Sequence, residues 1–197
     1  MEKRSNTWES WHRKKVEPRK VSRICDIDEQ FTMIENTTSI QEKPNHCIIE
    51  IGPADGTLCK YIITKYDNRI DNYTLIDDVS MLDICKNNLL EFDNITYVSI
   101  DDIETVNTEL YTIFISNHCL AETTQSYRKY IYDNIISKSQ EVFILDDTST
   151  GKHFNTDGNY KNELTESLNK LFDNVTISDG HKYSMKTQKL FYANNRK

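Results

Sequence analysis

The sequence lacks a long apolar run, a paired cysteine motif and an apolar stretch at its N-terminus. No segment approaches the ~18 to 20 consecutive apolar residues of a membrane-spanning helix, and the first residues do not resemble a secretion signal. None of the five cysteines forms a C-x-x-C pair, which argues against a disulfide or zinc framework; they are Cys25, Cys47, Cys59, Cys85 and Cys119. We therefore expect a cytoplasmic protein with free thiols and no membrane span.

Basic residues are outnumbered by acidic ones, except near the N-terminus. The net charge of −7 argues against general nucleic-acid binding, because neutralising phosphates requires an excess of Lys and Arg. Residues 1–23 nevertheless carry eight Lys or Arg against three Glu, so a basic leader precedes an acidic body. Trp8 and Trp11 could share one face of a short helix that covers a ligand site or a partner. The plainer alternative is a solvated leader that the two tryptophans anchor.

Residues 47–58 follow the pattern of a strand, a glycine turn and a helix. The β-branched residues of the strand give way to Gly52 and Gly56, which free the backbone from the φ limits of a side chain. Thr57 can cap the helix that follows. Small residues at 52, 54 and 56 would let a ligand approach the main chain and the helix N-terminus. The spacing departs from the G-x-G-x-x-G of dinucleotide sites, so this turn predicts a different ligand.

Acidic pairs follow three further predicted strands. The strand over 73–76 ends in Asp77 and Asp78, the one over 95–100 in Asp101 and Asp102, and the one over 141–145 in Asp146 and Asp147. Asp77 is well placed to accept hydrogen bonds from ribose hydroxyls, while Asp78 could equally serve as a carboxylate at a helix N-terminus. Acid-ended strands that alternate with helices predict a doubly wound α/β sheet with ligands at its carboxyl edge.

A fourth predicted strand, over 110–115, precedes Ser116, Asn117, His118 and Glu122. A histidine at the tip of a central strand can act as a general base near neutral pH, whereas a lone histidine is more often structural. Glu122 could orient His118 or a substrate hydroxyl, or merely favour the start of a helix. His153 is a second base candidate, in a turn-rich segment over 148–160 that could form a substrate loop.

The remaining patterns complete one domain. Short helices are expected within 24–45, over 57–66 and 79–90, from Tyr127 to about Ser137, and over 164–172. The segments 175–177 and 188–192 look like a closing antiparallel pair. A chain of 197 residues suits one α/β domain. We expect a basic leader and short helical cap over 1–45 and the main domain over 46–197.

Two stretches resemble a known family. The residues Glu50-Ile51-Gly52-Pro53-Ala54-Asp55-Gly56 resemble the first motif of S-adenosylmethionine-dependent methyltransferases of the Rossmann-like class I, with Ala54 in place of the middle glycine. The stretch from Ser116 to Glu122 resembles the fourth motif of sugar O-methyltransferases, with Ala121 where that pattern often has serine. The N-P-P-Y and D-P-P-Y tetrads of amino-directed nucleic-acid methyltransferases are absent.

The resemblance covers residues 46–193 and implies a mostly parallel seven-stranded sheet whose last strand is antiparallel. It also implies which residues contact each part of the donor. The turn would hold the methionine end, Asp77 or Asp78 the ribose, and Asp101 or Asp102 the adenine. The stretch that begins at Ser116 would face the transfer centre. The donor-binding residues it implies are Glu50, Gly52, Ala54, Gly56, Asp77, Asp78, Asp101, Asp102, Ile103, Ser116 and Asn117.

The activity implied is methyl transfer from S-adenosylmethionine to a hydroxyl of a sugar or nucleotide-sugar, with His118 and Glu122 in the catalytic roles. An O-methyltransferase of another small molecule is an alternative, and Asp146 and Asp147 resemble the divalent-cation site of its Mg²⁺-dependent members. A second alternative is a non-catalytic donor-binding subunit that docks a partner. No residue is assigned to a metal, and a homo-oligomer is one of the states that the sequence allows.

Overall fold

A computed structural model describes residues 27–106, 113–148, 160–180 and 188–196, without the side chain of Asp147. The leader with Trp8 and Trp11, the start of the predicted fourth strand at 110–112 and His153 lie outside these residues.

Seven strands form one sheet in the order β3-β2-β1-β4-β5-β7-β6. The strands are β1 (His46–Ile51), β2 (Ile70–Asp77), β3 (Ile95–Ser99), β4 (Ile113–Asn117), β5 (Glu141–Asp147), β6 (Phe172–Asp179) and β7 (Gln188–Arg196). The first five pair in parallel, and β7 runs antiparallel to both β5 and β6. The expected mostly parallel α/β sheet with an antiparallel last strand is therefore confirmed.

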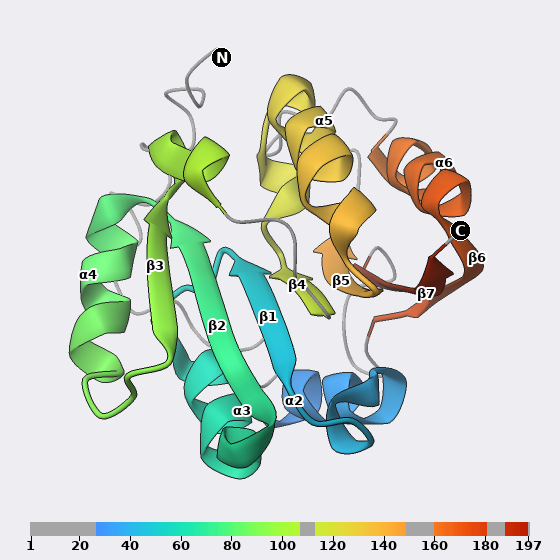
Figure 1. The fold of residues 1–197 in the computed structure, drawn as a ribbon. Helices are drawn as coiled ribbons and strands as arrows, with labels where there is room; N and C mark the ends of the chain where they lie inside the picture. The colour runs from blue at the N-terminus through green and yellow to red at the C-terminus, as the bar shows by residue number, and fades with distance from the viewer. Residues whose placement is uncertain (1–26, 107–112, 149–159, 181–187, 197) are drawn as a thin grey trace.

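Helices cover both faces of the sheet (Figure 1). The α-helices are α2 (Ile27–Thr37), α3 (Thr57–Tyr66), α4 (Val79–Asn88), α5 (Gln125–Asn134) and α6 (Tyr160–Leu171); short 3₁₀ turns are η2 (Ser39–Gln41), η3 (Asp67–Arg69), η4 (Ile100–Thr105), η5 (Leu120–Glu122) and η6 (Ile136–Lys138). No helix within the described residues is long and apolar enough to cross a membrane.

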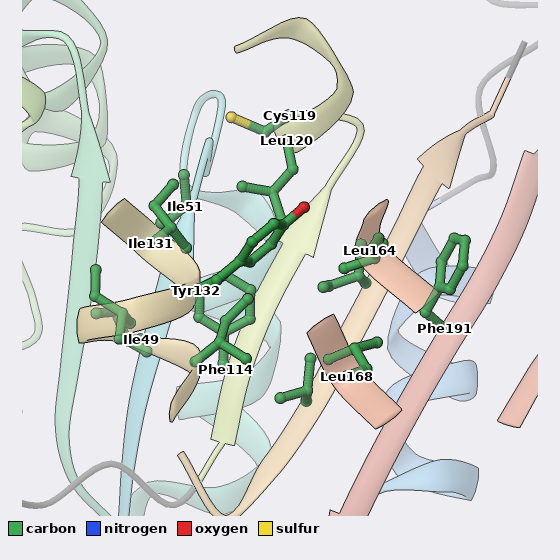
Figure 2. Packing of buried hydrophobic residues seen from close by; sticks show 14 of the residues in the cluster. Ile49, Ile51, Phe114, Cys119, Leu120, Ile131, Tyr132, Leu164, Leu168 and Phe191 are labelled. Carbon is green, nitrogen blue, oxygen red and sulfur yellow. The ribbon is translucent and has the colours of Figure 1, made fainter. Parts of the chain in front are cut away.

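The core is divided into two clusters because successive strand residues face opposite sides. Ile48 packs with α2, α3 and α4 on one face, and Ile49 packs with α5 and α6 on the other. Figure 2 shows the second cluster, in which Leu120 of η5 lies with Phe114 of β4 and Tyr132 of α5. Both faces of the central strands are buried, which explains the apolar runs at 48–49 of β1, 113–115 of β4 and 142–145 of β5.

Several element ends differ from the sequence prediction, among them those of β4, β3 and α3. β4 continues through Ser116 and Asn117, because these residues still pair with Ile144 and Leu145 of β5. β3 stops at Ser99, whose hydroxyl accepts the N–H of Asp101 and so caps η4. The cap of α3 is not Thr57, which is the first residue of that helix. The N-cap is Gly56, and the carboxylate of the preceding Asp55 accepts both the N–H (3.0 Å) and the hydroxyl (2.7 Å) of Thr57.

Candidate functional site

The turn after β1 adopts a left-handed backbone at three alternate positions. The φ angles are +76° at Gly52, +54° at Ala54 and +83° at Gly56. Glycine adopts this conformation without a steric penalty, whereas Ala54 does so at a cost of ~1 to 2 kcal/mol. Two hydrogen bonds tie the turn to α4: the Cys85 thiol donates to the Ala54 carbonyl, and the Asn88 amide donates to the Asp55 carbonyl. The turn is thus a rigid surface rather than a loose loop.

Gly52 also packs directly on the segment that follows β4. A Cβ atom at Gly52 would lie 2.6 Å from the Cβ of Cys119 and 2.7 Å from its Sγ. The N–H of Gly52 donates to the carbonyl of Ile76, at the end of β2. Gly52 therefore joins the carboxyl ends of three adjacent strands, and no larger residue fits between them without displacing one.

Asp77 and Asp78, at the end of β2, differ in their surroundings. Asp77 is 2% exposed, and its carboxylate accepts the N–H of Asp78 at 2.7 Å. Asp78 is half-buried and precedes α4 without capping it through its side chain. The Asp77 carboxylate is fixed in orientation, which makes it the better defined of the two acceptors at this strand end.

The acidic pair after β3 lies on η4. Asp101 and Asp102 are exposed, whereas Ile103 is buried in the core. Because Asp77 pairs with Ser99, this turn stands beside the end of β2. The two carboxylates can therefore contact a ligand at the rim, while the contribution of Ile103 is limited to its main chain and to packing.

Unpartnered polar atoms are found at the end of β4. Ser116 is fully buried, and its hydroxyl has no hydrogen-bond partner among the described residues. Both side-chain amide atoms of Asn117 are likewise buried without a partner there. Buried polar groups are normally hydrogen-bonded, so such a pair at one strand end favours a ligand-binding position.

His118 opens the segment after β4 in a left-handed conformation, with φ of +52°. Its N–H donates to the Leu145 carbonyl of β5 at 2.7 Å. Non-glycine residues with this backbone concentrate at functional sites, where the surroundings impose the strain. Glu122 is half-buried at the end of η5, and its N–H bonds back to the Cys119 carbonyl. The two catalytic candidates therefore stand at the two ends of one short turn.

Glu50 lies beneath the turn rather than on its surface. Its side chain is 2% exposed, on the face that carries α3 and α4, and accepts the hydroxyl of Tyr73 at 2.8 Å. Burial, together with the nearby carboxylates of Asp77 and Asp55, raises its pKa to about 7, although the Tyr73 hydrogen bond acts in the opposite direction. From its position beneath the turn, Glu50 can therefore help to fix the turn's conformation and contribute to the electrostatic potential at its surface.

Asp146, one of the two candidate metal ligands, is already engaged with protein donors. Its Oδ2 atom accepts the N–H of Ala121 and the hydroxyl of Tyr160, each at 2.8 Å. Among the residues that the structure describes, no three His, Cys, Asp or Glu side chains come together in a group that could hold a metal ion. Through its hydrogen bond with the N–H of Ala121, Asp146 holds the backbone of η5 in place.

Strand register brings the candidates to one edge of the sheet. Ile51 pairs with Ile76 on one side and Ser116 on the other, so the turn, Asp77 and Asn117 follow each other across the sheet. The described turns at this edge contain acidic residues and no Lys or Arg over 52–56, 77–80, 99–106 and 117–124. A hollow of about 360 Å³ near Phe92 and a groove of about 700 Å³ near Glu141 lie at the opposite, amino edge.

Comparison with solved structures identifies this architecture. The N-methyltransferase NodS of Bradyrhizobium japonicum WM9, solved with S-adenosyl-L-homocysteine, superimposes with a TM-score of 0.70 over 96% of this chain and 98% of its own, at 13% identity. The chain has the class I methyltransferase fold. No protein-family model matches the sequence, and no curated protein matches it.

Other proteins with the methyltransferase fold are equally distant in sequence. TrmK of M. capricolum, in complex with the cofactor product S-adenosyl-homocysteine, gives a TM-score of 0.52 at 14% identity, over 84% of this chain and 67% of its own. The CurJ carbon methyltransferase gives 0.57 at 13% identity, over 77% of this chain and 49% of its own. N- and C-methyltransferases thus share the fold, which leaves the acceptor atom undetermined.

Three residues around the site were not predicted from the sequence. Tyr73 holds Glu50, Cys119 contacts Gly52, and Arg128 is a buried cation behind η5. Only Arg128 carried a sequence signal, because it lies between Tyr127 and Ile131 on the apolar side of a predicted helix. The other two contacts join residues that are distant in the chain.

Proposed function

We propose that this chain binds S-adenosylmethionine at the carboxyl edge of its sheet and transfers the methyl group to a hydroxyl of a sugar or nucleotide-sugar. The observation that carries the proposal is the rigid left-handed turn after β1, which joins β2 and the segment after β4 within a methyltransferase fold. The resemblance of the stretch from Ser116 to Glu122 to sugar O-methyltransferases supports the choice of acceptor.

The residues present fit such a donor. Its sulfonium and ammonium groups are positively charged, and every charged residue in the turns listed above is acidic. The oriented carboxylate of Asp77 suits ribose hydroxyls, and the exposed Asp101 and Asp102 can accept from an adenine amine. The unpartnered amide of Asn117 and the hydroxyl of Ser116 would gain partners when a ligand is bound.

The bound donor would supply a methyl group on a positively charged sulfur, ready for direct displacement. The protein would then contribute position and proton transfer. His118 would accept the proton of the acceptor hydroxyl, and Glu122, the last residue of η5, would orient the imidazole or a second hydroxyl.

A methyl-transfer assay tests the proposal. Pure protein is incubated with S-adenosylmethionine and with sugars and nucleotide-sugars in turn, and S-adenosylhomocysteine is measured with Mg²⁺ and with a chelator. We expect turnover that depends on the acceptor, and a kcat for His118→Asn that is about 100-fold lower. Asparagine is the chosen replacement because it tolerates φ near +52° better than most residues.

The assay also separates the alternatives. Turnover that a chelator abolishes would favour a metal-dependent O-methyltransferase. Donor binding without turnover on any acceptor would instead favour a binding-only subunit. A kcat for His118→Asn equal to that of the wild type would contradict the role of His118 as base.

A further inference from the structure

A fully buried arginine lies behind the turn that carries His118 and Glu122. Arg128 of α5 has no exposed side-chain surface. Its Nε and Nη2 atoms donate to the two carboxylate oxygens of Glu163 in α6, each at 3.1 Å. Its Nη1 atom donates to the carbonyl of Thr123 at 2.6 Å, and its guanidinium lies 5.3 Å from the ring centre of Tyr160. The cation thus joins α5, α6 and the residue directly after η5.

A buried carboxylate holds the same turn from the other side. Asp146, at the end of β5, is 1% exposed and accepts both the N–H of Ala121 and the hydroxyl of Tyr160. Burial raises the pKa of the Tyr160 phenol well above its ordinary value, and the Asp146 carboxylate acts in the same direction. The Tyr160 phenol therefore keeps its proton near neutral pH and donates it to Asp146.

The two groups fix the same short piece of backbone. The main chain is held at His118 by β5, at Ala121 by Asp146 and at Thr123 by Arg128. Two of these attachments come from the end of β5 and the third from α5, and together they can hold His118 in a left-handed backbone that costs ~1 to 2 kcal/mol.

Stability alone does not account for this arrangement. A buried ion pair is often no more stabilising than apolar side chains of the same volume, whereas it does impose a defined geometry. A displacement of 1 Å at reacting groups can lower a rate about 100-fold. We propose that Arg128 and Asp146, with Glu163 and Tyr160, are positioning residues that orient the turn from His118 to Thr123 toward the methyl acceptor. This inference rests on the proposed function for its purpose, and on the contacts above for its geometry.

The test compares Tyr160→Phe and Arg128→Met with two matched controls. Tyr192→Phe removes a similar phenol hydrogen bond, to Glu141 at the amino end of β5, and Lys129→Met removes an exposed ion pair to Asp133 on the same helix as Arg128. NMR reports the ring signals of His118 and His46 and the hydrogen exchange of the Ala121 amide, and calorimetry reports S-adenosylmethionine binding. Tyr160→Phe is the variant that keeps the ion pair and is the one expected to remain folded.

In both test variants we expect the Ala121 amide to exchange at least about tenfold faster and the His118 ring signals to shift. The signals of His46, at the amino edge of the sheet, should not shift. The affinity for S-adenosylmethionine should stay within about twofold of the wild type. With an acceptor in hand, kcat should fall while the KM for the donor stays unchanged. Lys129→Met should match the wild type in every readout, and Tyr192→Phe should match it in the His118 and Ala121 signals and in donor affinity. The His46 signals are not compared in Tyr192→Phe, because Tyr192 bonds Glu141, whose charge acts on His46.

Unchanged His118 and Ala121 signals in Tyr160→Phe would overturn the inference, as would equal changes in Tyr192→Phe. A loss of donor affinity as large as the loss of kcat would also contradict it, because the network would then support the whole site. If wild-type protein fails to bind S-adenosylmethionine, the proposed function fails, whereas the NMR comparison still decides whether the network holds the turn.

Discussion

Replacement of Gly52 by alanine is expected to lower the free energy of unfolding by about 2 to 4 kcal/mol, from the left-handed backbone and from overpacking. The added Cβ would lie 2.6 Å from the Cβ of Cys119, at a φ of +76°. Because this contact joins the turn to the segment after β4, the affinity for the donor should fall together with the free energy of unfolding. Chemical denaturation and calorimetric titration with S-adenosylmethionine measure the two effects.

Gly56→Ala is the matched control for this variant. Its φ of +83° imposes the same backbone cost, but the new Cβ meets the far end of the Leu89 side chain, at 2.9 Å, which can shift more easily than the Cβ of Cys119. It should therefore cost about 1 to 2 kcal/mol. In a Cys119→Gly background the cost of Gly52→Ala should fall toward that of Gly56→Ala. Equal costs in the two backgrounds would show that Cys119 does not constrain the turn.

Replacement of Glu50 by glutamine is expected to remove a pH dependence from folding stability. The folded protein holds the Glu50 proton up to a pKa of about 7, against 4.5 as the ordinary value, because burial disfavours the charged form. Glu50 therefore contributes its full stability below pH 4.5, and this contribution is lost as pH rises through 7. The loss is worth about 3 kcal/mol.

Glutamine keeps an acceptor for the Tyr73 hydroxyl and carries no charge. We expect Glu50→Gln to be more stable than the wild type at pH 8 by about 2 kcal/mol, after a cost for its buried amide N–H groups. Urea denaturation from pH 4.5 to 8 measures the difference between the two proteins. Glu91→Gln removes an exposed partner of Lys60, and its free energy of unfolding should change with pH as that of the wild type does. The same pH dependence of the free energy of unfolding in Glu50→Gln and in the wild type would contradict the raised pKa of Glu50.

The sheet could be predicted because its signals are local. Runs of β-branched residues, two glycines and acidic strand ends identify the strands and the turn after β1. The resemblance to class I methyltransferases implied the seven strands and the antiparallel last strand. The same local reasoning could have placed Glu50. It lies two residues after Ile48 in a strand buried on both faces, so its side chain had to be buried as well.

The network behind η5 could not be predicted in the same way. Arg128 and Glu163 are 35 residues apart, and Ala121 and Asp146 are 25 apart, so no sequence spacing signals either pair. An acidic pair at a strand end is equally consistent with a metal site, a turn and a buried hydrogen-bond acceptor. The burial of Asp146 and its two hydrogen-bond donors identify it as a buried acceptor. Both features depend on how α6 packs on β5.

Calorimetric titration of the pure protein with S-adenosylmethionine decides whether the carboxyl edge of the sheet binds the donor. We expect a single site with an affinity in the micromolar range. Asp77→Ala should lower this affinity by at least about 100-fold, because two ribose hydrogen bonds to the buried carboxylate disappear. Asp71→Ala, at an exposed position near the start of the same strand, should bind as the wild type does. Folded wild-type protein that binds no S-adenosylmethionine, or Asp77→Ala that binds it undiminished, would contradict the account.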